Sequence, residues 1–207
     1  MRIALIIGVW MIALAGGVLL YTAQQTAGSV GNPENTATVA NVIAEAEAAI
    51  EDVAPGAVAF SLPDMDGNAR DINEWSGKYR VLNFWATWCA PCRREIPLLK
   101  TFQDEHVGDD IQVIGIAVDF MEDVTRYAEK AQFNYPVLVG QEDAMAVAES
   151  SGVPFIGLPF TMIVDNEGQL IDTHMGEIFE DDLKKLAETL KALDDGTLSL
   201  EEARQIL

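Results

Sequence analysis

The only two cysteines of this 207-residue chain are Cys89 and Cys92, which are separated by two residues in the sequence Trp-Cys-Ala-Pro-Cys. The β-branched and aromatic residues of segment 80–86 predict a buried strand, and segment 93–102 reads as an amphipathic helix. The cysteines therefore lie where a strand gives way to a helix, and Pro91 is acceptable in the first helical turn. The helix dipole and the free N–H groups of that turn favour a thiolate, so the pattern indicates thiol–disulfide exchange.

Other uses of a Cys-x-x-Cys pair fit this chain less well. A structural disulfide that closes so short a loop removes little entropy from the unfolded chain. A structural zinc site needs four ligands, and beyond the cysteines only His106 and His174 could supply imidazoles. Covalent haem attachment needs a histidine directly after the second cysteine, where this chain has Arg93. We therefore expect no metal and no cofactor other than the redox-active Cys89–Cys92 pair.

The N-terminal segment 1–21 predicts a membrane anchor. Residues 3–21 carry no charge and are long enough to span a bilayer. Arg2 precedes this stretch and no Lys or Arg follows until Arg70, which puts the N-terminus in the cytoplasm and the rest of the chain outside. A cleaved secretory signal is the alternative. Under either interpretation the domain is exported, and we expect a single-pass protein of the inner membrane with its catalytic domain on the periplasmic side.

The net charge of −20 argues against nucleic acid as a partner, because nucleic-acid binding needs a basic face. A solvated acidic surface keeps an exported protein soluble. Attraction of a basic partner is the other interpretation, and the basic residues Arg93 and Arg94 beside the cysteines weaken it.

The rest of the chain predicts one α/β domain, from residue 53 to 193, behind residues 22–52, which read as a flexible tether followed by a short Ala- and Glu-rich helix. Strands that alternate with helices, then a hairpin and a last helix, predict a central mixed sheet covered by helices on both faces. We expect strands at 58–62, 69–72, 111–118, 135–139, 160–164 and 169–174, and helices at 122–133, 142–150 and 180–193. The acidic extension 194–207 has a weak helical pattern. We expect it to be loosely packed, with a partner-binding helix as the alternative.

Three segments together resemble a known family. Residues 60–67, 81–97 and 159–168 are similar to the TlpA/ResA-type membrane-anchored, thioredoxin-like thiol–disulfide oxidoreductases. The resemblance covers roughly residues 53–193. It implies a thioredoxin-like fold with an added N-terminal hairpin.

The resemblance also implies roles for the cysteines and their neighbours. Cys89 matches the attacking cysteine and Cys92 the resolving cysteine, which breaks the mixed disulfide. Glu95, one helical turn beyond Cys92, matches an acidic residue near the cysteines, and a buried carboxylate with a raised pKa could take the Cys92 proton. An exposed helix glutamate in a weak surface pair is the other interpretation of Glu95. Pro97 matches a proline that kinks the active-site helix.

Four residues are expected at the substrate-binding surface. Trp88 directly precedes Cys89, and Pro91 lies between the two cysteines. Pro159 matches the family's cis-proline, which lies against the two sulfurs. The neighbouring Leu158 would offer its backbone to an extended substrate strand. The approach to this proline, 154–158, is longer than is usual in the family, which bears on substrate preference.

These features predict an exported disulfide reductase. Its clients would be disulfide-bearing proteins such as apocytochromes c or copper-site proteins, and a membrane electron donor of the DsbD/CcdA kind would reduce it again. A disulfide oxidase or isomerase on the same fold is one alternative. A Cu(I) metallochaperone is another. A peroxidase fits poorly, because Leu82 and Ala86 occupy the positions of that class's proline and hydroxyl residue.

Overall fold

The computed structural model describes residues 57–152 and 154–207. The predicted anchor 1–21 and the predicted tether and helix at 22–52 lie outside these residues. Within the described part of the chain, no helix combines the length and apolar character that crossing a membrane requires.

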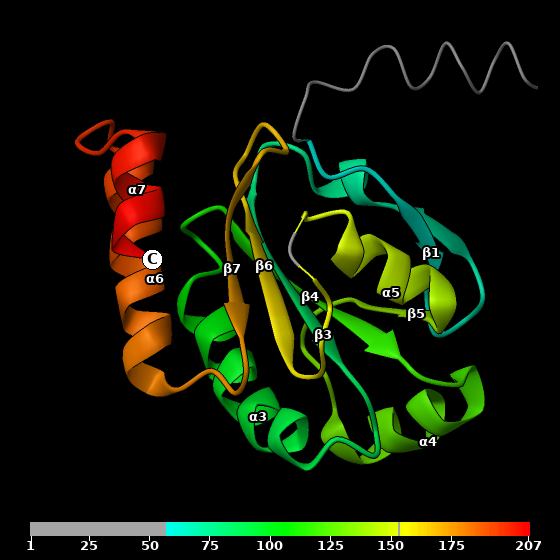
Figure 1. Cartoon of the computed structure of the whole chain (residues 1–207). Coiled ribbons are helices and arrows are strands. Elements are labelled where there is room, and N and C mark those ends of the chain that lie inside the picture. The colour runs from blue at the N-terminus through cyan, green and yellow to red at the C-terminus, as the bar shows by residue number, and fades with distance from the viewer. Residues whose placement is uncertain (1–56, 153) are drawn as a thin grey trace, which may run out of the picture. The chain divides into compact units, whose positions relative to one another are not determined.

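A five-stranded mixed sheet with the order β5-β4-β3-β6-β7 forms the centre of the molecule (Figure 1). The central strand β3 (Tyr79–Trp85) pairs in parallel with β4 (Ile111–Val118), which pairs in parallel with β5 (Val137–Gly140). On its other side β3 pairs antiparallel with β6 (Phe160–Val164), and β6 pairs antiparallel with β7 (Leu170–Met175). The predicted mixed sheet is therefore confirmed.

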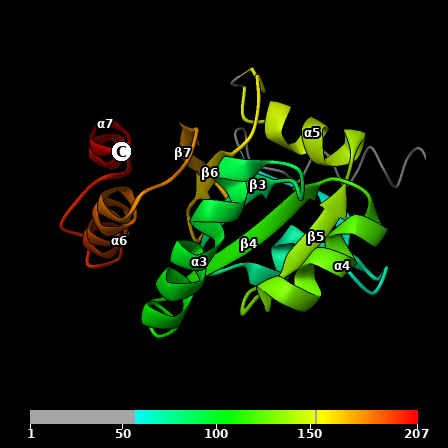
Figure 2. The same ribbon diagram turned by 90° about the horizontal axis from the view of Figure 1, so that it is seen from below.

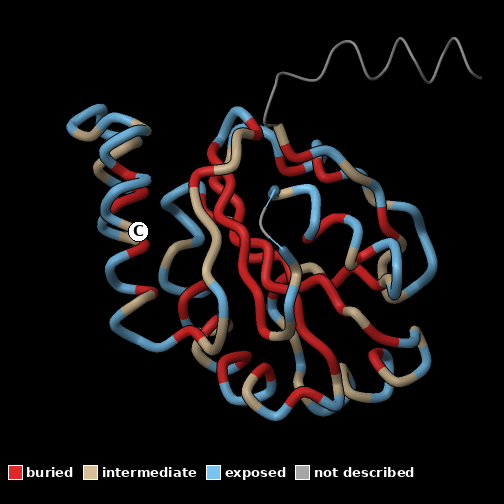
Figure 3. Tube along the Cα trace, in the orientation of Figure 1, coloured by how far each residue is buried: buried red, intermediate tan, exposed pale blue. Residues whose placement is uncertain are grey.

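Helices cover both faces of this sheet because the side chains of its inner strands alternate between two cores. One core receives side chains from α3 (Ala90–Glu105), α4 (Met121–Ala131) and α6 (Glu180–Asp194). The other receives side chains from α5 (Glu142–Glu149). In β3, residues 81 and 85 belong to the first core and residues 82 and 84 to the second. Figure 2 shows the helices from a second direction, and Figure 3 shows that the buried part of the chain follows the central strands.

An N-terminal hairpin precedes the sheet, as the resemblance implied. Strand β1 (Ser61–Pro63) pairs antiparallel with β2 (Ala69–Asp71), and a 3-10 helix, η1 (Ile72–Trp75), follows. In the turn between the strands, Asp64 Oδ1 accepts hydrogen bonds from the backbone N–H groups of Asp66 and Asn68. This side-chain acceptor replaces backbone partners that so short a hairpin cannot supply.

The C-terminal extension packs against the domain, so the prediction of a loosely packed segment was wrong. Its helix α7 (Leu200–Ile206) buries Ala203 completely, and the Arg204 guanidinium donates a hydrogen bond of 2.9 Å to the carbonyl of Leu170 in β7. Leu198, Leu200 and Leu207 pack against the same core as α6. Ser199 and Glu202 form a capping box at the start of α7, which stabilises this short helix.

Candidate active site

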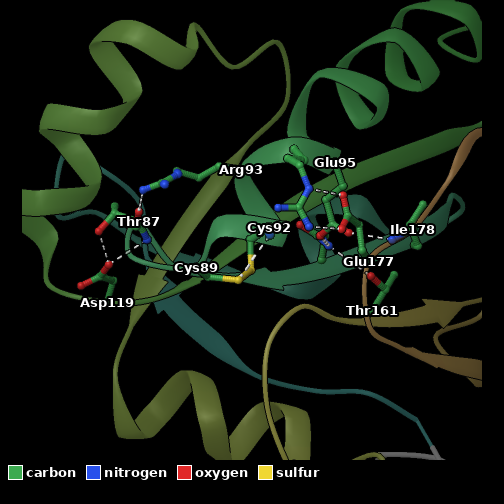
Figure 4. The surroundings of a disulfide bond; sticks show 11 residues. Thr87, Cys89, Cys92, Arg93, Glu95, Asp119, Thr161, Glu177 and Ile178 are labelled. Atoms are coloured by element: carbon green, nitrogen blue, oxygen red, sulfur yellow. Dashed lines mark hydrogen bonds and ion pairs between the residues drawn. A yellow bond between two sulfur atoms is a disulfide. The ribbon is translucent and has the colours of Figure 1, made fainter.

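Cys89 and Cys92 form a disulfide at the start of α3, with their Cα atoms 5.3 Å apart (Figure 4). Strand β3 ends at Trp85, and Cys89 is the N-cap residue of α3. Its sulfur lies 3.3 Å from the backbone N–H of Cys92, a free donor of the first helical turn. Cys92 is completely buried, whereas Cys89 keeps a small exposed surface. The predicted strand-to-helix position is confirmed, and the first sulfur is the more accessible one.

The loop that leads to Cys89 is held by Asp119, which follows the last residue of β4. Asp119 Oδ2 accepts hydrogen bonds from the Thr87 backbone N–H at 2.9 Å and from the Thr87 hydroxyl at 2.5 Å. Its other oxygen accepts from the N–H of Phe120 at 2.8 Å. Sequence reasoning missed this support. Its signal was an acidic residue directly after the apolar segment 111–118, at the sheet edge that β3 also reaches.

Glu95 is completely buried, which excludes the interpretation of an exposed helix glutamate. One carboxylate oxygen accepts a hydrogen bond of 2.8 Å from the Asn83 side chain, and the other accepts one of 2.8 Å from the backbone N–H of Ile178. Burial raises the pKa of Glu95 to about 7, against the opposing effect of these two hydrogen bonds, and the nearby Glu177 carboxylate acts in the same direction as burial. The expected raised pKa is therefore present, while a role in proton transfer stays a prediction.

Asn83, in the middle of β3, connects Glu95 to the neighbouring strand. Its Nδ2 donates to Glu95 and also to the hydroxyl of Thr161 in β6, at 3.1 Å. Both Asn83 and Thr161 are completely buried. The sequence contained a signal that we did not use, because an asparagine inside the apolar run 80–86 needs a buried hydrogen-bonding partner.

An ion pair fixes the loop that carries the Ile178 N–H. Arg94, next to Glu95 in α3, donates from Nε to Glu177 Oε1 at 2.9 Å and from Nη2 to Glu177 Oε2. Glu177 directly precedes Ile178. The pair therefore holds the donor of Ile178 against the Glu95 carboxylate (Figure 4).

The expected substrate-binding residues lie at two points around the disulfide. Trp88 is 68% exposed and Pro91 is half-buried in the first turn of α3. The bond between Leu158 and Pro159 is cis, as predicted. Pro159 directly precedes β6, and Phe160 pairs with Phe84 near the end of β3 that leads to the cysteines. The cis-proline and the disulfide therefore belong to the same edge of the sheet. Binding of substrate by these four residues stays a prediction.

Among the described residues, no group of three or more His, Cys, Asp or Glu side chains is arranged to hold a metal ion. Met162, whose thioether would be a soft metal ligand, is completely buried in the core on the α5 side of the sheet. The cysteines lie in the other core. A thioether from Met162 therefore does not reach the two sulfurs.

A mixed sheet whose central strand leads into a Cys-x-x-Cys helix, with a cis-proline at the same edge, defines a thioredoxin-like thiol–disulfide oxidoreductase. The chain belongs to the AhpC/TSA family, whose family model matches residues 50–173. The predicted family resemblance and enzyme class are confirmed by relatives as well.

One of these relatives is the thiol-disulfide oxidoreductase ResA of Geobacillus thermodenitrificans (strain NG80-2). It is 28% identical over 142 residues, which cover 67% of this chain and 79% of that protein. The thioredoxin-like protein YneN of Bacillus subtilis (strain 168) is 28% identical over 130 residues, 61% of this chain and 73% of that protein. A crystal structure of a thiol:disulfide interchange protein of the thioredoxin family from Chlorobium tepidum TLS matches with a TM-score of 0.59. Its identity is 25%, and the match covers 66% of this chain and 95% of that chain.

Proposed function

We propose that this protein is an exported, membrane-tethered reductase of disulfides in client proteins. The observation that carries this proposal is a disulfide at a helix start, in which Cys89 keeps a small exposed surface, combined with a buried carboxylate one turn beyond Cys92. The first feature suits attack on a client, and the second suits proton transfer during release. The residues between the cysteines, Ala90 and Pro91, support the reducing direction, because strongly oxidising relatives usually place a histidine there.

In the reduced protein, the Cys89 thiolate attacks one sulfur of a client disulfide, and the other client sulfur leaves as a thiolate. The Cys92 thiol then loses its proton to the Glu95 carboxylate and attacks Cys89 Sγ. The mixed disulfide breaks, the second client sulfur leaves and takes up a proton, and the enzyme holds the Cys89–Cys92 disulfide. Two electrons have passed to the client, which departs as a dithiol.

Client binding would use the backbone next to the cis-proline. Among the described residues, the backbone N–H and C=O of Leu158 have no hydrogen-bond partner, although the neighbouring Pro159 carbonyl accepts from the Gly176 N–H at 3.0 Å. An extended client segment can pair with such an unoccupied edge. Trp88 and Pro91 would contact that segment on the side of α3.

The uncharged segment 3–21 and the family resemblance support a membrane anchor with the enzyme domain outside the cytoplasm. In an oxidising compartment the dithiol needs continuous reduction. A membrane electron donor of the DsbD/CcdA kind would supply the electrons. Apocytochromes c and copper-site proteins are the client classes that the resemblance suggests.

Trapping of client adducts tests the proposal. Cys92→Ser removes the resolving thiol, so mixed disulfides on Cys89 should accumulate in cells as adducts that reducing agents release. The matched control carries Cys89→Ser together with Cys92→Ser, and it should form none. If the single variant yields no more adducts than this control, the proposed role for Cys89 is wrong.

A further inference from the structure

Three cationic side chains gather between α3 and α4, although the chain as a whole carries −20. A cavity of about 430 Å³ lies between α3 and α4. We call it the α3–α4 pocket. Its lining includes three cationic side chains, Arg93, Lys100 and Lys130, and one acidic side chain, Asp104. The pocket is therefore locally positive in an acidic protein.

Backbone carbonyls, not carboxylates, fix two of these cations. Arg93 Nη1 donates to the carbonyl of Thr87 at 2.7 Å, and Lys100 Nζ donates to the carbonyl of Ala131 at 2.7 Å. In residues 57–152 and 154–207, none of Arg93, Lys100 and Lys130 has a carboxylate within ion-pair distance. The charges of Arg93 and Lys100 are thus held in place, and none of the three charges is neutralised by a carboxylate, which favours binding of a carboxylate ligand.

The first residue of the pocket lining lies one helical turn after Cys89, and the lining continues along α3 away from that cysteine. The Arg93 N–H donates to the Cys89 carbonyl at 3.2 Å, so Arg93 stands one helical turn after that cysteine. Arg93 and Glu95 are about 200° apart around α3. In agreement with this, Figure 4 shows the Arg93 side chain directed to Thr87, away from Glu95. At 1.5 Å per residue, Arg93 and Lys100 lie about 6 Å and about 16 Å along the axis from Cys89.

We propose that the α3–α4 pocket binds an acidic side chain of the disulfide client, two to five residues from the client cysteine that Cys89 attacks. An extended chain advances about 3.4 Å per residue. Starting from the client cysteine at Cys89, two residues therefore reach about as far as Arg93, and five residues reach about as far as Lys100. The client carboxylate accepts hydrogen bonds from these cations, while Ile96, Pro97 and Tyr127 supply apolar contacts for its stem. A basic side chain at the same position meets uncompensated cations and is disfavoured. This inference rests on the proposed reductase function.

The test uses the full chain, reduced beforehand, and symmetric peptide disulfides in which two copies of a short neutral peptide are joined through their cysteines. The third residue after each cysteine is Glu, Gln or Lys. Enzyme oxidation is followed by alkylation of remaining thiols and mass measurement, so no external reductant is needed. Ionic strength is kept at about 0.1 M, where charges farther than about 10 Å are largely screened. The Glu peptide is expected to react about three- to fivefold faster than the Gln peptide, and the Lys peptide more slowly than both.

The variants Arg93→Gln and Lys130→Gln should each reduce the Glu-to-Gln rate ratio, and together they should bring it close to 1. Lys130→Arg keeps the charge and should keep the ratio. The matched control is Lys184→Gln with Lys185→Gln, which also removes two positive charges, but from α6 and outside this pocket. It should leave the ratio unchanged.

Equal rates for the Glu and Gln peptides, or an unchanged ratio in the Arg93→Gln, Lys130→Gln double variant, would overturn the proposed pocket while leaving the reductase function intact. If the wild type reacts with none of the three peptides, the reductase function would be overturned, and the pocket with it. If oxidised glutathione reacts faster than the Glu peptide and loses this advantage in the double variant, the pocket serves a small anionic disulfide instead of a client segment.

Discussion

The Glu95 carboxylate is a buried acid near the disulfide whose charge can change near neutral pH. It has no exposed surface, it accepts two hydrogen bonds at 2.8 Å, and burial raises its pKa to about 7. Below that pH it holds a proton that it can donate, and above it the carboxylate can accept one from Cys92. At the scale of single residues, we therefore expect this group to control how thiol–disulfide exchange depends on pH.

Glu95→Gln should slow the resolving step at least tenfold at pH 8, because glutamine cannot accept the Cys92 proton. In the wild type the rate of resolution should rise with pH through about 7, as Glu95 ionises. The variant should lack this rise. Stopped-flow reduction of a peptide disulfide at several pH values measures it, and Glu105→Gln, an exposed glutamate of the same helix, is the control. A retained rise near pH 7 in Glu95→Gln would assign the titration to another group.

The same pKa predicts a pH-dependent stability of the oxidised protein. The Glu95 pKa is about 7 when folded and 4.5 in the unfolded reference, so the folded protein binds more protons between these values. The free energy of unfolding should therefore fall as pH rises from 4.5 to 7 and then level off. Relative to Glu95→Gln, the loss should be about 3 kcal/mol. Urea unfolding of both proteins at pH 4.5 and pH 8 measures this loss. If the free energy of unfolding changes by the same amount in both proteins, the raised pKa of Glu95 would be contradicted.

Asn83 should tune Glu95, because its side-chain N–H groups favour the ionised carboxylate. Asn83→Leu removes this donor, so the midpoint of the pH–rate profile should move to higher pH. Thr161→Val removes the bond between Asn83 and β6 but leaves the bond to Glu95, and it should move the midpoint less. Exchange rates over pH 5 to 9 for both variants distinguish the two effects. An unmoved midpoint in Asn83→Leu would show that this bond does not influence Glu95.

At the scale of secondary structure, α7 completes the core that α6 and β7 would otherwise leave open. Ala203→Asp places a charge at a completely buried position and should lower the free energy of unfolding by about 2–4 kcal/mol. The matched control Glu201→Gln, on the exposed side of α7, should change it by less than about 0.5 kcal/mol. Urea unfolding measures both. Equal stability of the two variants would mean that α7 is not packed as described.

Periodicity located the elements well where one side of the segment is buried along its whole length. The predicted strands at 111–118 and 160–164 coincide with β4 and β6, and the helix at 180–193 differs from α6 by one residue. The helix predicted at 93–102, with Pro91 in its first turn, corresponds to α3, which begins at Ala90 and continues three residues further, to Glu105. The strand predicted at 58–62 begins only at Ser61, since hydrogen bonding to β2 sets its start.

The cysteines, the cis-proline and the buried glutamate of the site were predictable because a motif or a resemblance marks each one. For Asn83 and Asp119 the sequence shows a polar residue in or directly after an apolar run, but not its partner. The contacts of Asn83, Thr161 and Asp119 depend on which strands become neighbours and on which face each side chain points to. Tertiary pairing supplies that information, and a single sequence leaves it open. The packing of α7 was missed for the same reason, since a weak amphipathic pattern does not show which surface will accept it.

At the scale of the whole molecule, we expect electrons to flow from the enzyme dithiol to client disulfides. A reductase in an oxidising compartment must hold its dithiol at a low reduction potential, so that client disulfides take its electrons. We expect the buried Glu95 and the fixed loop at Thr87 to influence this potential through the protonation and position of the two sulfurs. We also expect the charges of the α3–α4 pocket to influence which clients approach.

The most direct test is the reduction potential of the full chain, equilibrated in thiol redox buffers at pH 7. The fraction of protein with Cys89 and Cys92 reduced is read by alkylation and mass measurement. A disulfide reductase should give a value near that of thioredoxin, about −270 mV. A value between about −120 and −180 mV is typical of disulfide donors and isomerases, and it would contradict the proposed reductase direction.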